Sequence, residues 1–280
     1  MRYMSLPFQK IVFVCVRSLT GLAAFGCALA MATTDPARHL FIEDMTWTEL
    51  HAKLASGATT VLIPIGGTEQ SGPHMALGKH NVRVKALAGL IAQQLGNAVV
   101  APVLAYVPEG GITPPEAHMR FTGTLSISAD AFESVLASTA KSFKQHGFHH
   151  VVFLGDHGGY QKNEVHVADK LNKEWAADAR CRVHALTAYY AAAQAPFEKV
   201  LKARGYSQTE IGTHAGLADT SLMLAVDPSL VRMDKLAVAP KDRLSQGVYG
   251  DPARSAAELG RLGVQIVVDK SVQAIREITR

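Results

Sequence analysis

The sequence is poor in cysteine, in repeated motifs and in long uninterrupted apolar runs. It has three cysteines in 280 residues, and two of them, Cys15 and Cys27, lie in an apolar segment near the N-terminus. Cys181 alone lies in residues 33–280, so no intramolecular disulfide can support that part of the chain. The sequence shows no internal repeat and no low-complexity linker. Its 48% hydrophobic and 19% charged residues therefore predict a globular domain that depends on its hydrophobic core.

The first 32 residues have the pattern of a secretory signal peptide. Basic residues precede or interrupt an apolar stretch whose uninterrupted part, roughly 19–32, is shorter than a membrane-spanning helix requires. The stretch ends in small residues that include two A-x-A cleavage patterns, ALA and AMA. We expect residues 33–280 to be periplasmic or secreted after cleavage. An uncleaved anchor is the alternative, and a lipoprotein modified at Cys27 is a weaker one.

Positive charge is also scarce outside that segment. The net charge of the whole chain is +4, with 28 basic and 24 acidic residues. Removing residues 1–32 removes Arg2, Lys10 and Arg17 and no acidic residue, which leaves +1. We find no basic stripe along the chain, so a nucleic-acid partner is not expected.

Apolar runs alternate with segments of helical periodicity. The runs that we expect to be strands are 59–65, 98–104, 149–155 and 182–188. The segments that we expect to be helices are 81–95, 129–146 and 160–178, with a further helix-like stretch after Asp251 whose continuity is left open by Gly260 and Gly263. This order predicts one α/β domain with a mainly parallel sheet and crossover helices.

Acidic residues and histidines gather in the loops after the first and third expected strands. Glu69, His74 and His80 follow the first strand, and Asp156 and His157 follow the third. Ligands collect at the carboxyl ends of parallel strands, and carboxylate and imidazole are common ligands of Zn²⁺ and similar ions. A single loop histidine is usually a surface or hydrogen-bonding residue. Two such loops together predict a metal or acid–base site.

Two further segments offer weaker candidates. The loop after the second strand, PEGGITPPEAHMRFTGT, contains His118, which either faces the pocket or caps a turn. The stretch GTHAGLADTSLML contains His214 and Asp219 ahead of an apolar run. Its simpler interpretation is a helix start capped by Asp219 or Thr220.

Five segments together resemble the creatininase family of metal-dependent amidohydrolases. In chain order they are IPIGGTEQSGPHMALGKH, EAHMRFTGTLSIS, GDHGGYQ, HAGLADTS and GVYGDPARSAAELG. They span about residues 59–260 in the order of that family's motifs. The resemblance implies a three-layer α/β/α sandwich over residues 33–280, often assembled into hexamers.

The resemblance also implies a chemistry. In that family two metal ions share a bridging carboxylate and activate a water that attacks a C–N bond, commonly in a cyclic amide or a formamide. Matched onto this sequence, Glu69 and His157 correspond to ligands of the first ion. Asp219 corresponds to a ligand of the second ion, and His214 to a histidine placed for proton transfer.

Three positions depart from the family pattern. Ser71 stands at a histidine ligand, His80 at the bridging aspartate and Asp156 at a glycine. An imidazole offers a metal one lone pair and cannot bridge two ions as a carboxylate does. We therefore expect a mononuclear site, with one divalent ion per chain held by Glu69, His80 and His157.

The identity of the ion and the remaining ligands are expected as follows. Zinc is the first choice, with manganese or iron as alternatives. Asp156 or Asp219 completes the ligand shell or orients a ligand histidine. A rival hypothesis is that the carboxylate of Asp156 replaces the bridging carboxylate that is lost at His80, which would keep two ions.

The sequence thus predicts a metal-dependent hydrolase of a small non-peptide amide, active as a homo-oligomer and not inserted in a membrane after signal cleavage. The predicted metal ligands are Glu69, His80, His157 and Asp219, and the predicted catalytic residues are His214 and Asp156. A non-catalytic periplasmic metal- or ligand-binding protein on the same scaffold is one alternative. A lactonase-type ester hydrolase is the other.

Overall fold

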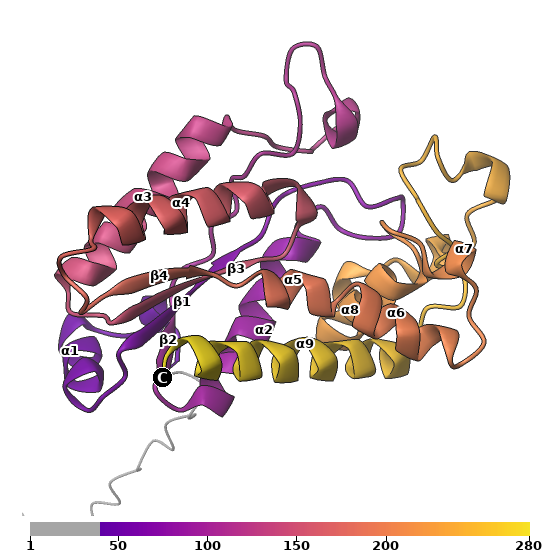
Figure 1. Cartoon of the computed structure of the whole chain (residues 1–280). Coiled ribbons are helices and arrows are strands. Elements are labelled where there is room, and N and C mark those ends of the chain that lie inside the picture. The colour runs from indigo at the N-terminus through magenta and orange to yellow at the C-terminus, as the bar shows by residue number, and fades with distance from the viewer. Residues whose placement is uncertain (1–39) are drawn as a thin grey trace, which may run out of the picture. The chain divides into compact units, whose positions relative to one another are not determined.

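The computed structural model describes residues 40–280, which contain a four-stranded parallel sheet with helices on both faces (Figure 1). The strands are β1 (Thr60–Ile65), β2 (Ala98–Val100), β3 (His150–Gly155) and β4 (Arg182–Ala185). Their order across the sheet is β2-β1-β3-β4, and every neighbouring pair is parallel. The central strand β1 pairs Thr60 with both Ala98 and His150.

Helices connect the strands and complete the domain. They are α1 (Trp47–Ala55), α2 (Lys79–Leu95), α3 (Ala129–Gln145), α4 (Gln161–Glu174), α5 (Thr187–Ala192), α6 (Ala195–Lys202), α7 (Gln208–Ile211), α8 (Leu217–Val226) and α9 (Ala257–Ile278). Helices α3 and α4 cover one face of the sheet, while α2, α5 and α9 cover the other (Figure 1). The predicted three-layer α/β/α architecture is confirmed.

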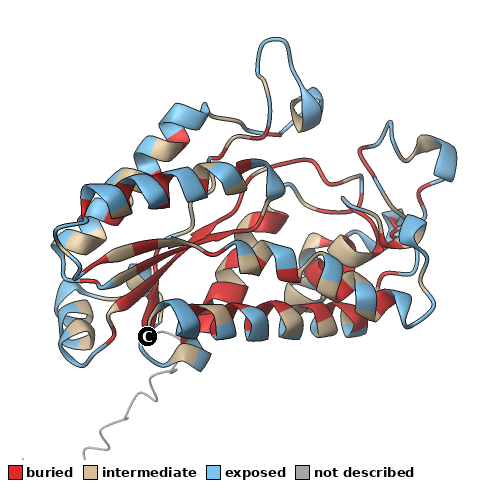
Figure 2. Cartoon of the chain, in the orientation of Figure 1, coloured by how far each residue is buried: buried red, intermediate tan, exposed pale blue. Residues whose placement is uncertain are grey.

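The strands are apolar on both faces because each face has its own core. Along β1, Val61 and Ile63 pack in the cluster that includes Phe132 of α3, whereas Leu62 packs in the cluster that includes Leu87 of α2. All six residues of β1 are buried, as Figure 2 shows for the strands at the centre of the domain. Continuous apolar runs are therefore the expected pattern of these strands.

The structure refines three predicted elements. Strand β2 ends at Val100, and Leu104 makes only an isolated bridge to Ile65. Strand β4 ends at Ala185, and α5 begins two residues later. The tail forms one continuous helix, α9, in which Gly260 and Gly263 are sites of close packing and do not end the helix.

Among residues 40–280, no helix is both long enough and apolar enough to cross a membrane. The predicted signal peptide, residues 1–32, lies outside the described residues.

Candidate metal centre

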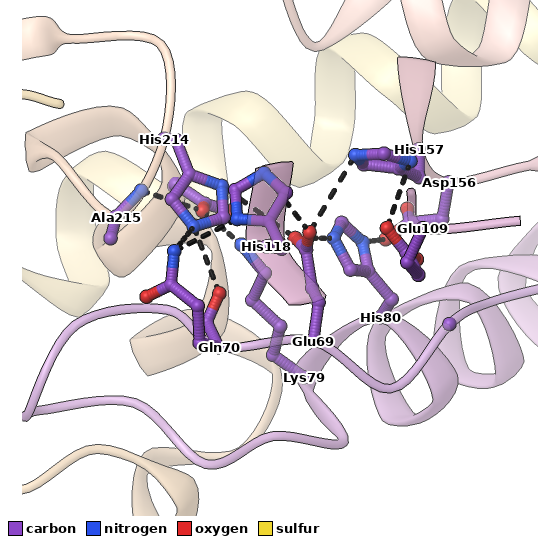
Figure 3. A network of polar contacts seen from close by, with 12 residues as sticks. Glu69, Gln70, Lys79, His80, Glu109, His118, Asp156, His157, His214 and Ala215 are labelled. Carbon is purple, nitrogen blue, oxygen red and sulfur yellow. Dashed lines mark hydrogen bonds and ion pairs between the residues drawn. The ribbon is translucent and has the colours of Figure 1, made fainter. Parts of the chain in front are cut away.

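Segments that are far apart in the sequence bring charged and imidazole side chains together at the carboxyl edge of the sheet (Figure 3). Glu69 lies in the loop after β1, and Glu109 lies in the long loop after β2. His157 is the second residue after β3, and His214 lies between α7 and α8. Parallel strands place the first three of these segments at one edge of the sheet, where the sequence predicts the site.

Glu69 is the centre of the cluster. Its side chain is fully buried, and its Oε1 atom accepts a hydrogen bond from Nε2 of His80 at 2.7 Å. Its Oε2 atom has no hydrogen-bond partner but lies 3.6 Å from Nε2 of His157. Burial alone would raise the pKa of Glu69, but Lys79 and His80 hold that pKa well below its ordinary value. Glu69 is therefore an ionised carboxylate with one oxygen free to bind a cation.

His80 bridges two carboxylates. Its Nε2 atom faces Glu69, and its Nδ1 atom lies 2.5 Å from Oδ2 of Asp156. Burial and Lys79 act to lower the pKa of His80, but the two carboxylate hydrogen bonds leave that pKa above its ordinary value. Because both ring nitrogens face carboxylate oxygens at hydrogen-bond distance, both are placed as donors and neither points a lone pair at a metal. The geometry favours a structural role for His80 over the ligand role that the sequence predicts.

Asp219 is held by two buried cations. Nζ of Lys79 contacts its Oδ2 atom, and Nη1 of Arg83 lies 2.6 Å from its Oδ1 atom. Burial would raise the pKa of Asp219, but these two charges keep that pKa well below its ordinary value. Both oxygens have cationic partners, so this geometry too favours a role other than the predicted metal ligand. Helix α8 begins at Leu217, which places Asp219 in the first turn and not at the cap.

Asp156 anchors the same network from the end of β3. Its carboxylate accepts hydrogen bonds from His80, from Nε of Arg83 at 2.9 Å and from the hydroxyl of Tyr189 at 2.8 Å. Burial would raise the pKa of Asp156, but the charges and hydrogen bonds of Arg83 and His80 together lower it. A carboxylate that accepts hydrogen bonds from three side chains is suited to orient His80 and Arg83.

Among residues 40–280, two groups of three side chains have ligand atoms close enough to share a metal ion, within 4.8 Å of one another. Both groups contain Glu69: one adds Glu109 and His157, and the other adds His118 and His214. The first contains two predicted residues and Glu109, which was not predicted. The second contains His214, for which proton transfer is predicted.

Glu109 is the side chain of these two groups whose hydrogen-bonding capacity is least satisfied. It is 3% exposed, neither of its oxygens has a hydrogen-bond partner, and Oε2 lies 3.5 Å from Nδ1 of His157. Burial, followed by the negative charge of Glu69, raises the pKa of Glu109 to about 8. A Cβ at Gly67 would lie 2.4 Å from Oε1 of Glu109, so only glycine lets the β1 loop pass this close. Orphaned buried carboxylate oxygens of this kind fit a bound cation.

Gln70 holds the two histidines of the other group. Its amide Nε2 lies 2.8 Å from Nδ1 of His118, and its Oε1 accepts from the backbone of Gly72. Nε2 of His214 donates to the backbone oxygen of Gln70 at 2.9 Å, which leaves the lone pair on Nδ1 of His214. That Nδ1 atom lies 3.6 Å from Oε1 of Glu69. Burial lowers the pKa of His214 to about 3, so this histidine is neutral near pH 7.

A cavity of about 370 Å³ opens beside the cluster. It is lined by residues that include Glu69, His118, His157, Tyr190, His214 and Tyr249. His74, by contrast, is buried away from the cavity with Nε2 at 3.0 Å from the hydroxyl of Thr220. Tyr160, in the loop after β3, is buried in the core between β1 and α3.

Sequence reasoning missed Glu109, Lys79 and Arg83 as members of the site. Glu109 lies in a loop that the sequence singles out, but the run PEGG is typical of a turn, and no local pattern shows where its side chain points. Lys79 and Arg83 are charged residues in the first turns of a helix, where solvent exposure is the usual outcome. Their partner Asp219 is more than 130 residues away.

A known protein family and several known proteins are similar to this chain in sequence. The family whose description is "Creatinine amidohydrolase" matches residues 43–275. A mycofactocin precursor peptide peptidase of Mycolicibacterium smegmatis is 30% identical over 81% of this chain and 83% of its own length. A creatinine amidohydrolase of Pseudomonas putida is 23% identical over 86% of this chain and 97% of its own length.

Solved structures agree with these relatives. A mutant creatininase described as "Zn-Zn type" has a TM-score of 0.70 and 25% identity, and the match covers 85% of this chain and 97% of that chain. A structure titled "Creatininase Mn" has a TM-score of 0.69. The names show that those proteins bind zinc and manganese.

Proposed function

The chain belongs to the creatininase family of metal-dependent amidohydrolases, and from this premise we propose that it hydrolyses a non-peptide C–N bond in a small molecule. The observation that carries the proposal is the pair of buried carboxylates, Glu69 and Glu109, beside His157. Three of their four oxygens have no hydrogen-bond partner. Carboxylate and imidazole donors in this number fit one divalent ion such as zinc, manganese or iron.

We assign Glu69, Glu109 and His157 as the residues that hold the ion. A divalent ion at such a site supplies Lewis acidity, which lowers the pKa of water to about 7 and polarises a carbonyl group. In this arrangement His80 and Asp219 are not ligands. They fix the positions of Glu69 and of the α2 side chains, because their own donor and acceptor atoms are already paired.

His214 is the proposed proton-transfer residue. Both His214 and Glu69 line the cavity, with the unprotonated Nδ1 atom of His214 3.6 Å from Oε1 of Glu69, and the Nε2–H of His214 is fixed by the backbone oxygen of Gln70. A neutral imidazole with one free lone pair can accept a proton from the attacking water and return it to the leaving nitrogen. His118, which Gln70 also holds, stacks against His214 with ring centroids 4.4 Å apart.

The dimensions of the cavity favour a compact substrate. Its volume of about 370 Å³ is near the lower end of the range of about 300–1,000 Å³ that is usual for small-molecule sites. A lactam or formamide fits this volume better than a folded peptide does. A lactone is the alternative substrate, because the same chemistry cleaves esters.

The proposal is tested with a panel of lactams, formamides, lactones and creatinine. Residues 33–280 are purified and loaded separately with Zn²⁺, Mn²⁺ and Fe²⁺. We expect turnover of at least one amide, and we expect His157→Ala and Glu109→Gln to lose bound metal and activity together. His51→Ala, at an exposed histidine of α1, is the matched control and keeps both.

Two outcomes would contradict the proposal. Full activity of His157→Ala would remove the assigned ion from the reaction. Tight metal binding with no turnover of any compound would instead favour the non-catalytic binding protein on the same scaffold.

Location and assembly are part of the proposal. The N-terminal pattern supports export of residues 33–280 to the periplasm or beyond, and the family resemblance supports a homo-oligomer, with a hexamer as the first expectation. Mass spectrometry of the mature N-terminus and light scattering of the purified protein test these two points.

A further inference from the structure

We infer that Lys79 and Arg83 occupy the place of a second metal ion, so that the second cation of this site is part of the polypeptide. The inference rests on the proposed function, because it concerns the same carboxylates. Both side chains are buried, with 1% of the Lys79 side chain and 8% of the Arg83 side chain exposed. Both also line the cavity beside Glu69.

Lys79 and Arg83 pair with the carboxylate oxygens that lie on one side of Glu69. Lys79 contacts Oδ2 of Asp219 and lies 3.5 Å from Oε1 of Glu69. Arg83 reaches Oδ1 of Asp219 through Nη1 at 2.6 Å and Oδ2 of Asp156 through Nη2 at 2.8 Å. A metal ion needs lone pairs on such oxygens at about 2.0–2.2 Å. Here those lone pairs accept hydrogen bonds from the ammonium group of Lys79 and the guanidinium group of Arg83.

The two cations come from one face of one helix. Residues 79 and 83 are four apart in α2, so their side chains project in the same direction. Two like charges at this spacing repel each other in an isolated helix. Asp219 of α8 compensates that repulsion by pairing with both cations, and Asp156, directly after β3, pairs with Arg83. The ion pairs of Lys79 and Arg83 thus join α2 to α8 and to the end of β3.

The opposite side of Glu69 has no such cations. Oε2 of Glu69 and both oxygens of Glu109 lack hydrogen-bond partners, and the imidazole of His157 lies beside them. The hydrogen bonding of the acid oxygens is therefore incomplete on this side. A cation entering the cluster finds unpaired carboxylate oxygens next to His157, whereas next to Asp219 it would have to displace Lys79 and Arg83.

This division predicts a metal count that differs from that of the mutant creatininase described as "Zn-Zn type". A side that is already neutralised by a lysine and an arginine does not fit a second ion. We therefore expect one ion per chain, and we expect removal of a built-in cation to open the second position. The prediction concerns the number of bound metal ions and not the rate of turnover.

The test measures metal stoichiometry and uses no assay of activity. Apo-protein of residues 33–280 is titrated with Zn²⁺ by calorimetry, and bound zinc is counted by inductively coupled plasma mass spectrometry after gel filtration. We expect one ion per wild-type chain. We expect Lys79→Ala and Lys79→Gln to rise towards two at saturating Zn²⁺, with the second ion bound more weakly.

Lys79→Arg and Lys85→Ala are the controls, and both should retain one ion. Lys85 is on the same helix but is exposed and pairs with Glu43. Thermal melts establish that each variant is folded, and the glutamine variant replaces the alanine variant if the latter unfolds. Two tightly held ions in the wild type, or one ion in both folded Lys79 variants, would overturn the inference and leave the proposed function intact. A wild type that binds no ion would instead overturn the proposed function.

Discussion

At the scale of single residues, Glu164 is a carboxyl group that the fold buries without a hydrogen-bond partner. It lies in α4, is 0% exposed, and burial raises its pKa well above the ordinary value of 4.5. Because its folded-state pKa is raised, its unfavourable contribution is absent below about pH 4.5. Stability is then lost progressively as the pH rises towards the folded-state pKa. Glu164→Gln should therefore raise the free energy of unfolding at pH 8 and leave it nearly unchanged at pH 4.5.

Urea denaturation at several pH values measures this effect. Glu174→Gln, at the exposed end of the same helix, is the control and should show no such dependence on pH. An equal gain for Glu164→Gln at both pH values would show that the side chain's shape, and not its charge, is responsible.

Tyr160 connects the two loops that carry Glu69 and His157. Its buried hydroxyl lies 2.6 Å from the carbonyl oxygen of Gly66 and accepts from the backbone N–H of His157 at 3.1 Å. Tyr160→Phe leaves these backbone groups without a partner, which should cost about 1–3 kcal/mol of stability. Chemical denaturation measures the loss, and Tyr106→Phe, at a residue that is 60% exposed, is the control. A Tyr160→Phe variant as stable as the wild type would remove this connecting role.

At the scale of elements, α8 and α9 pack so closely that a glycine is required between them. A Cβ at Gly260 would lie 1.8 Å from the backbone oxygen of Ser221 and 2.8 Å from Cβ of Ala225. Gly260→Ala improves helix propensity by about 1 kcal/mol but must push the helices apart, for which overpacking costs of roughly 1–3 kcal/mol or more are usual. Because the obstacle is backbone, we expect a net loss of about 2 kcal/mol.

Thermal and urea unfolding of Gly260→Ala measure that loss. Lys270→Ala, at an exposed position of the same helix, should stay within about 0.5 kcal/mol of the wild type. A stabilised Gly260→Ala variant would mean that α8 and α9 can separate without cost.

The same glycine shows what the sequence can and cannot predict about the elements. The alternation of apolar runs and helical segments predicted the strands and the main helices, because burial of both sheet faces leaves a local signature. Gly260 made the continuity of α9 uncertain, because a glycine that breaks a helix and one that permits close packing look alike in sequence. Only the position of Ser221 distinguishes them.

For the site, the sequence predicted the loops better than the roles of their side chains. Glu69 and His157 converge because both follow parallel strands. The pairing of Asp219 with Lys79 depends on how α8 approaches α2, which no local pattern records. The assignment of ligands among the predicted residues therefore remains a prediction that metal-binding experiments must test.

At the scale of the whole molecule, the candidate metal centre joins the loops after β1, β2 and β3. Glu69, Glu109 and His157 come from these three loops, so an ion between them would link segments that the sheet alone holds at one edge. The ligands are together only in the folded chain. Binding should therefore stabilise the native state with little effect on the unfolded state.

Metal removal should consequently lower the melting temperature of the protein. At a free Zn²⁺ concentration 100 times the dissociation constant, binding contributes about 2.7 kcal/mol, which corresponds to roughly 5–10 °C for a domain of this size. Calorimetric scans of residues 33–280 with Zn²⁺ and with EDTA measure the shift. Glu109→Gln should melt at the same temperature in both conditions, because it lacks a ligand, while Lys85→Ala should keep the full shift. If EDTA leaves the wild-type melting temperature unchanged after zinc has been shown to bind, the ion does not hold the three loops together.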